Sequence, residues 1–160
     1  MVENCIFCNE EKLKDQIICQ TDFFYAIFDI HPVNPGHMLI IPKRHIISVR
    51  EFSDEEWINL KPFIKVVVDE IEKLDFKDVY EKMKNNIFSE KSPWFCNEII
   101  QKLEENDKIE GYNVGWNFGK AAGNRVEHWH LEVIPRFFGD SVNPDGGIKK
   151  AVDNIILDYR

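Results

Sequence analysis

The stretch VEHWHLEVIPRF, residues 126–137, carries two histidines and a glutamate at every second position: His128, His130 and Glu132. Apolar residues fill the positions between them: Trp129, Leu131 and Val133. Successive side chains of a β-strand point to opposite faces of its sheet. The stretch therefore predicts a strand with one face in the hydrophobic core and with two imidazoles and a carboxylate on the other face.

Three further segments predict partner strands for this one. Residues 17–30 (IICQTDFFYAIFDI) are rich in Ile, Phe and Tyr around a Thr-Asp turn, which predicts a hairpin of two strands. Residues 38–42 (MLIIP) predict a short apolar strand that ends at its proline. Residues 111–119 (GYNVGWNFG) alternate in polarity, so they and the first stretch predict an antiparallel hairpin. Together these segments predict an antiparallel sheet of about five strands.

Two segments have the spacing of amphipathic helices. Ser53 and Glu56 form a capping-box pattern, after which apolar residues recur every three or four positions to about residue 74. Pro62 is expected to kink this helix. A second helix is expected to begin at Ser92, which precedes a proline, and to end near residue 106. We therefore predict an α+β fold with helices packed against the sheet, in a single domain over residues 1–160.

Charge and hydropathy exclude two classes of partner. The chain has 160 residues and a formal net charge of −8, without any run of lysine and arginine, which argues against binding to a nucleic-acid polymer. No segment approaches the roughly 20 apolar residues of a membrane span, and the first residues lack a signal-peptide pattern. We expect a soluble, cytoplasmic protein that does not associate with a membrane.

Two of the four cysteines, Cys5 and Cys8, form a Cys-x-x-Cys pair. In a reducing cytosol such a pair indicates metal binding or redox chemistry, and thioredoxin-type redox chemistry would need a preceding strand, so metal binding is favoured. Zinc usually takes four Cys or His ligands. Five histidines are available to complete the set: His31, His37, His45, His128 and His130. The residues alone leave open which of them bind metal and which one faces a substrate.

Three segments resemble the histidine triad (HIT) superfamily of nucleotide hydrolases and transferases, in order and in spacing. They are CIFC at residues 5–8, FDIHPVNPGHMLIIPKRH at 28–45 and NFGKAAGNRVEHWHLEVIPR at 117–136. The resemblance extends over residues 5 to about 50 and 111 to about 140. It implies a HIT-like fold, in which residues 75–110 resemble a helical insertion.

The resemblance also implies roles for particular residues. His130 aligns with the histidine that attacks the α-phosphorus of a nucleotide and forms a covalent nucleotidyl-histidine. Four residues align with the ligands of a structural Zn²⁺ in the zinc-containing members: Cys5, Cys8, His45 and His128. Three lie where the family contacts ribose and a purine base: Phe28, Asp29 and Ile30. Three more lie where it contacts phosphate: Asn117, Gly123 and Arg125. His37 is expected only to make a hydrogen bond within its loop.

Glu132 replaces the third histidine of the triad, which is the main departure from the family pattern. An ionised carboxylate about 4 Å from a phosphoryl group opposes its binding by a few kcal/mol at a surface-like dielectric. Glu132 is therefore expected to act as a protonated general acid. Alternatively, it hydrogen-bonds His130 and sets its tautomer, or it forms an ion pair with Arg125. In the remaining case catalysis is lost and nucleotide binding persists. Arginine at position 125 is also unusual, because Ser or Thr is more common there.

The predicted function is hydrolysis or transfer at the α-phosphate of a nucleotide conjugate, either a dinucleoside polyphosphate or a nucleoside phosphoramidate. The segment RFFGDSVNPDGG, residues 136–147, resembles the region after the catalytic strand in dinucleoside polyphosphate hydrolases and phosphorylases, which favours the first substrate. The resemblance also implies a homodimer. The alternative is a catalytically silent module that binds a nucleotide or docks a partner.

Overall fold

A five-stranded antiparallel sheet forms the centre of the molecule in the computed structural model, which describes residues 5–85, 92–105, 107–141 and 144. The spatial order is β1-β2-β3-β5-β4. The strands are β1 (Ile17–Gln20), β2 (Phe24–Phe28), β3 (Met38–Pro42), β4 (Gly111–Gly115) and β5 (Leu131–Arg136). The predicted antiparallel sheet of about five strands with packed helices is confirmed, including both hairpins.

The region around the two histidines differs from the prediction, because β5 begins at Leu131 and so excludes both imidazoles. Trp129 N–H donates to the carbonyl of Ile46 at 2.6 Å, in the loop after β3. The imidazole of His128 is fully buried beneath the same loop. Trp129 is therefore hydrogen-bonded to the loop after β3, and β4, which ends at Gly115, does not extend beside residues 128–130.

Helix α2 (Asp54–Ile71) begins at the predicted cap. Ser53 Oγ accepts from Glu56 N at 3.1 Å, and Glu56 Oε2 accepts from Ser53 N at 2.8 Å. Pro62 lies inside the helix. Helix α4 (Ser92–Glu105) corresponds to the second predicted helix, whereas α3 (Phe76–Asn85) lies within the expected helical insertion but was not predicted as a separate helix. Short helical turns complete the described chain: η1 (Ile6–Cys8), α1 (Glu10–Leu13), η2 (Lys14–Gln16), η3 (Val49–Glu51) and η4 (Lys120–Ala122).

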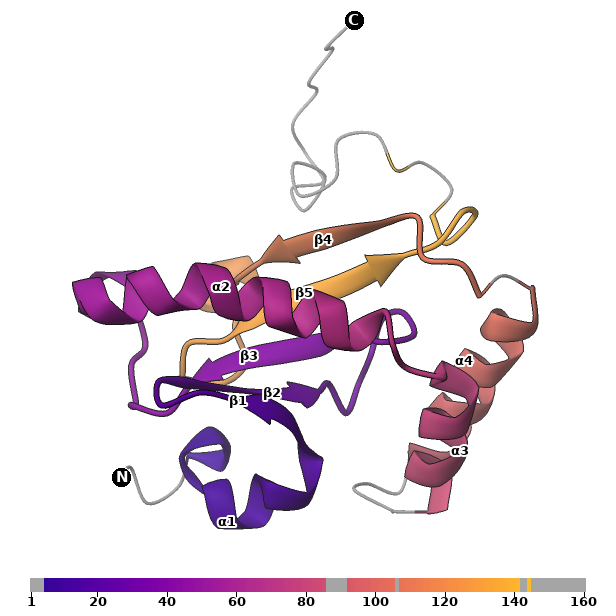
Figure 1. The fold of residues 1–160 in the computed structure, drawn as a ribbon, viewed down its shortest axis with the longest axis horizontal. Helices are drawn as coiled ribbons and strands as arrows, with labels where there is room; N and C mark the ends of the chain where they lie inside the picture. The colour runs from indigo at the N-terminus through magenta and orange to yellow at the C-terminus, as the bar shows by residue number, and fades with distance from the viewer. Residues whose placement is uncertain (1–4, 86–91, 106, 142–143, 145–160) are drawn as a thin grey trace, which may run out of the picture.

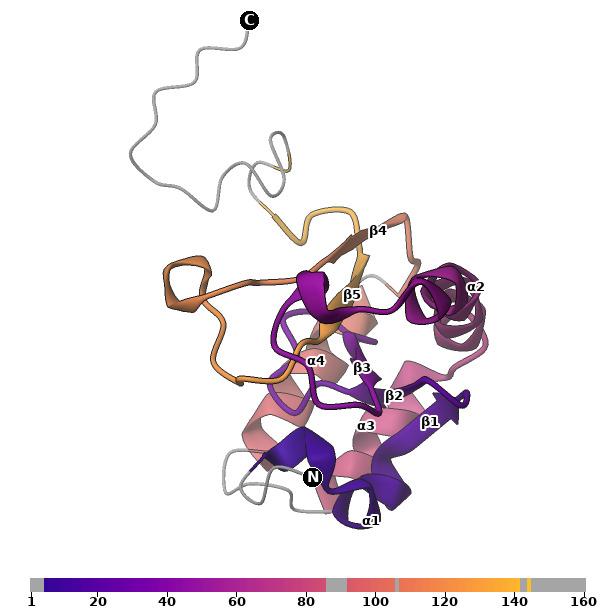
Figure 2. The ribbon, with the colours of Figure 1, turned by 90° about the vertical axis from the view of Figure 1, so that its left-hand side faces the viewer.

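The two faces of the sheet are covered differently. Helix α2 lies across one face, and α3 and α4 lie together beside one end of the sheet (Figure 1). The main core on this side includes the three apolar residues of the 126–137 stretch, as predicted: Trp129, Leu131 and Val133. A smaller cluster on the other face packs Phe7 and Leu13 of the N-terminal segment against β2 and β3. Figure 2 shows α2 on one side and the loop before β5 projecting on the opposite side.

Within the described ranges, the helices are too short or too polar to cross a lipid bilayer.

Candidate functional site

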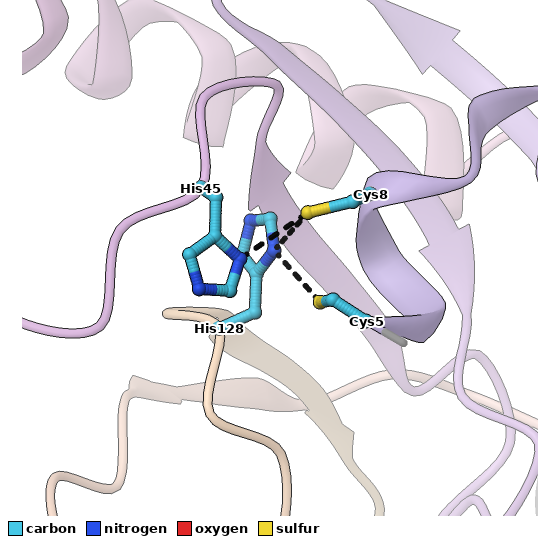
Figure 3. Close-up of side chains that lie close together, drawn as sticks. All are labelled: Cys5, Cys8, His45 and His128. Carbon is cyan, nitrogen blue, oxygen red and sulfur yellow. Dashed lines mark hydrogen bonds between the residues drawn. The ribbon is translucent and has the colours of Figure 1, made fainter. Parts of the chain in front are cut away.

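Four side chains from three separate segments converge next to the start of β5 (Figure 3): Cys5, Cys8, His45 and His128. One ligand atom of each lies within 4.8 Å of the other three. Cys8 Sγ is 3.2 Å from His45 Nδ1 and 3.6 Å from His128 Nδ1. In a tetrahedral zinc site, bonds of about 2.3 Å to sulfur and 2.0 Å to nitrogen place S and N about 3.5 Å apart. The four side chains therefore fit a single tetrahedral metal ion.

The protonation of His128 also suits metal binding. Its Nε2 lies 2.9 Å from the carbonyl oxygen of Pro42. A carbonyl only accepts, so Nε2 carries the hydrogen and Nδ1 presents a lone pair toward the two thiols. Burial lowers the pKa of His128 to about 4, which keeps the imidazole neutral near pH 7. Burial likewise raises the pKa of the Cys5 thiol, and a bound cation would counter this effect.

His130 lies on the same side of the chain as His128. The ring of Phe7 contacts both imidazoles edge-on, with centroid distances of 5.8 Å to His128 and 5.5 Å to His130. His130 Nδ1 is 2.8 Å from the carbonyl oxygen of His128. Nδ1 must therefore be the donor, which leaves the lone pair of His130 on Nε2. A half-buried imidazole with a bare Nε2 is equipped to act as a nucleophile or a base.

Asp29 and His37 lie at the two ends of one loop, where Asp29 N donates to His37 O at 3.0 Å. The Nδ1 of His37 is 3.6 Å from Asp29 Oδ2 and accepts from Val33 N at 3.5 Å. Burial lowers the pKa of His37. The carboxylate of Asp29 opposes this downward shift, and nearby His130 adds to it. The His37 side chain is buried, and its Nε2 has no hydrogen-bond partner among the described residues.

Glu132 is half-buried beside this group. Its Oε1 accepts a hydrogen bond from Asn117 Nδ2 at 3.2 Å. Burial raises the pKa of Glu132; His130 opposes this shift, and the carboxylate of Asp29 adds to it. The register places Glu132 opposite Leu39 on β3, in the middle of the sheet. An acidic side chain whose pKa is raised by burial therefore lies near the His130 imidazole.

The remaining predicted substrate residues are more scattered. The ring of Phe28 is buried in the helix-side core, 6.2 Å from the ring of Tyr80, so the structure does not bring it together with His130. Ile30 is partly exposed. Gly123 and Arg125 are exposed on the loop before β5, where Gly123 has a φ of 85°.

Sequence reasoning missed two residues of this site. His37 was assigned a local hydrogen bond, yet it directly precedes β3 and shares the face of Leu39, which pairs with Glu132. The strand register would have revealed this position. Phe7 was overlooked because its neighbours, Cys5 and Cys8, carried the signal. A separate hollow of about 550 Å³ lies away from the site, between the end of α2, the start of α3 and the end of α4.

Comparison with curated proteins finds similar chains of known and unknown activity. An uncharacterised HIT-like protein of Methanocaldococcus jannaschii is 28% identical over 93% of this chain and 92% of its own length. The AP-4-A phosphorylase of Mycobacterium tuberculosis is 24% identical over 90% of this chain, which spans only 58% of that protein. The adenosine 5'-monophosphoramidase of Schizosaccharomyces pombe is 29% identical over 83% of this chain and 74% of its own length.

Comparison with solved structures agrees. The crystal structure of a histidine triad nucleotide-binding protein from Candida albicans superimposes with a TM-score of 0.53 at 27% identity, covering 82% of this chain and 74% of that one. The family model described as the HIT domain matches residues 10–139, which include the sheet, α2 and the site around His130. The chain therefore belongs to the HIT domain family.

Proposed function

We propose that this protein hydrolyses or transfers a nucleotidyl group, with His130 as the nucleophile that attacks the α-phosphorus. The observation that carries the proposal is the hydrogen bond from His130 Nδ1–H to the His128 carbonyl, which directs the free lone pair to Nε2. A neutral imidazole is a good nucleophile and a good leaving group near pH 7, so it divides one displacement into two easier steps.

In the first step the Nε2 lone pair forms a bond to phosphorus while the bond to the leaving group breaks. In the second, the oxygen of water or of another acceptor attacks the same phosphorus, and Nε2 leaves with its lone pair. A leaving amine or phosphate needs a proton. Glu132, whose pKa is raised by burial, would supply it as the protonated acid and recover it from the attacking water. Asn117 Nδ2 holds this carboxyl group in position.

Binding of the nucleotide would use the loop from Asp29 to His37. The carboxylate of Asp29 is available to accept from ribose hydroxyls, and exposed Ile30 offers apolar surface to the purine base. His37 Nε2 is a buried group without a partner in the described structure. A phosphoryl oxygen would satisfy such a donor, which would otherwise cost about 1–3 kcal/mol. Arg125 and the backbone of Gly123 would contact the phosphate chain.

Both proposed substrate classes have a counterpart among the relatives. One relative is named as an AP-4-A phosphorylase and another as an adenosine 5'-monophosphoramidase. The net charge of −8 fits a compact nucleotide conjugate better than a nucleic-acid polymer. The described cysteines are all free thiols, which agrees with a cytoplasmic protein.

A structural Zn²⁺ is proposed for the four-residue cluster. All four positions would be filled by Cys5, Cys8, His45 and His128, so the ion would have no open site for catalysis. It would stabilise the attachment of the N-terminal segment to the start of β5. Metal analysis of the purified protein should find about one zinc per chain.

A homodimer is also proposed, through the free edge of β4 and the adjacent surface of α2. Large apolar side chains are exposed on α2 and at or just after the end of β4: Trp57, Ile58, Val66, Val114 and Trp116. The rings of Trp57 and Trp116 lie 6.5 Å apart, so an exposed apolar patch spans the two elements at this point. A patch of this kind commonly marks a protein interface. Light scattering should report twice the mass of one chain.

The test of the catalytic proposal is intact-mass detection of a nucleotidyl adduct during turnover of adenosine phosphoramidate or diadenosine tetraphosphate. We expect the adduct on the wild type and on Lys65→Gln, a control in an exposed ion pair on α2. His130→Asn should give neither adduct nor turnover. An adduct of equal yield on His130→Asn would refute the assignment of the nucleophile.

One observation favours a second function, a catalytically silent nucleotide-binding module. Glu132 brings a carboxyl group to the phosphate region, where an ionised form would repel the substrate. Calorimetric titration with AMP, combined with a turnover assay on the same sample, separates the two functions. Binding without turnover, unchanged in His130→Asn, would support the silent module.

A further inference from the structure

The loop that carries Asp29 and His37 rests on helix α3, within the predicted helical insertion. Gly36 N–H donates to the hydroxyl oxygen of Tyr80 at 2.9 Å. Tyr80 is 1% exposed, and Gly36 is buried. The hydrogen bond therefore joins two groups that are shielded from water, and without it the Gly36 N–H would have no solvent to replace the lost acceptor.

A second contact lies beside this hydrogen bond. Gly36 has a φ of +77°, and a Cβ added to it would lie 2.6 Å from Cε1 of Phe76. The ring of Phe76, at the start of α3, is thus packed directly against the loop backbone. The ring of Tyr80 also packs against Phe28, at 6.2 Å between centroids, immediately before Asp29. Helix α3 therefore contacts the loop both at Gly36 and next to Asp29.

The geometry points to Tyr80 as a positioning residue for the proposed reaction, through which the 75–110 segment fixes the nucleotide loop. The inference rests on the proposed function, since it assumes that the loop from Asp29 to His37 binds the nucleotide. Gly36 precedes His37, and Asp29 N donates to His37 O, so displacement of Gly36 is transmitted to both ends of the loop. Tyr80 acts through these backbone contacts and does not touch the substrate.

The test compares Tyr80→Phe with Tyr112→Phe in the full chain. The control removes a hydroxyl that lies 3.5 Å from Glu72 Oε1 at the surface, far from the loop in sequence. Residue-resolved amide hydrogen exchange should show the Gly36 amide exchanging about tenfold faster in Tyr80→Phe, since its acceptor is gone. The control should exchange at the wild-type rate at this position.

Kinetics separate positioning from a loss of folded protein. A displaced loop moves Asp29 and His37 together, so Tyr80→Phe should raise KM several-fold and lower kcat. Loss of folded protein alone would lower the apparent kcat without changing KM. Equal exchange at Gly36 in Tyr80→Phe and in the control, or an unchanged KM with folded protein, would overturn the inference.

Two further outcomes remain decisive. If the wild type neither binds nor turns over a nucleotide, the proposed function fails, while the exchange comparison still decides whether Tyr80 fixes the loop. If Tyr80→Phe does not fold, Phe76→Leu keeps the hydroxyl and removes the ring beneath Gly36. That variant should raise KM in the same way, and a wild-type KM would overturn the inference.

Discussion

Asp140 is the residue whose substitution gives the most quantitative test of how the end of β5 is fixed. Its carboxylate accepts from Arg136 Nη2 at 2.6 Å, from Asn34 Nδ2 at 2.7 Å and from Arg136 Nε at 2.8 Å. It also accepts from Phe137 N at 2.9 Å. The Arg136 guanidinium is the main cause that lowers the pKa of Asp140 from 3.8 to about 2. The charged carboxylate is thus stabilised in the folded protein.

The size of the effect follows from this shift. A depression from 3.8 to about 2 corresponds to roughly 2.5 kcal/mol, at about 1.36 kcal/mol per pKa unit. Water screens the pair because residue 140 lies near the surface, so we expect Asp140→Asn to lower the free energy of unfolding by about 1 kcal/mol at pH 7. The folded pKa is depressed, so this contribution is present above pH 3.8 and disappears as the pH falls through about 2.

Urea unfolding followed by tryptophan fluorescence would measure this difference at pH 7 and at pH 3. The difference between wild type and Asp140→Asn should fall to about half at pH 3, since other carboxylates affect both proteins equally. The control is Asp78→Asn, which removes one partner of an exposed ion pair with Lys82 and should cost only about 0.3 kcal/mol. A difference that is absent at pH 7, or that does not change between the two pH values, would refute the reasoning.

Three further substitutions test the metal cluster, the acid and the glycine loop. Cys8→Ser should abolish stoichiometric zinc binding and lower the melting temperature by about 10 °C, whereas Cys19→Ser should retain the metal; equal zinc contents would contradict the cluster. Glu132→Gln keeps a neutral side chain like that of the protonated acid but cannot transfer a proton, so turnover should fall by at least about tenfold while calorimetry at pH 7 shows AMP affinity within about twofold of wild type; wild-type turnover would contradict the role of Glu132 as the acid. Gly36→Ala should lower the free energy of unfolding by about 2 kcal/mol more than Gly119→Ala. Both residues have positive φ, but only at Gly36 would the added Cβ clash with the ring of Phe76. Equal losses in the two variants would exclude that contact.

The elements with strong local signals could be predicted from the sequence. The hairpin of β4 and β5 follows from alternating polarity, and that of β1 and β2 follows from the Ile, Phe and Tyr residues around a Thr-Asp turn. The start of α2 follows from the Ser53 capping box, which the structure reproduces with both hydrogen bonds. Helix α3 was missed although its sequence carries a helical signal: Phe76, Val79, Tyr80 and Met83 recur every three or four positions, and the side chain of Asp75 accepts from Asp78 N at the start of the helix. Its stability comes from tertiary packing of Phe76 and Tyr80 against the core, which local sequence does not display.

The sequence motifs identified which residues belong to the candidate site but not how all of them are oriented. The four members of the metal cluster were identified from the resemblance, and the structure brings them together. The orientation of Phe28 and the position of His37 depend on strand register and on which face of the sheet α2 covers. These are properties of the assembled sheet, since a shift of one residue in register would exchange the two faces.

The metal cluster and the candidate nucleophile are connected by two short paths. His128 is held by the Pro42 carbonyl and would be held by the ion, while its own carbonyl accepts the Nδ1–H of His130. Phe7 lies between the two cysteines in sequence and contacts both imidazole rings. The His128 carbonyl determines which nitrogen of His130 is free, and an ion bound by Cys5, Cys8 and His128 would hold that carbonyl and the Phe7 ring in place without touching the substrate. A structural metal would in this way support the orientation of the proposed nucleophile, although it takes no part in the reaction.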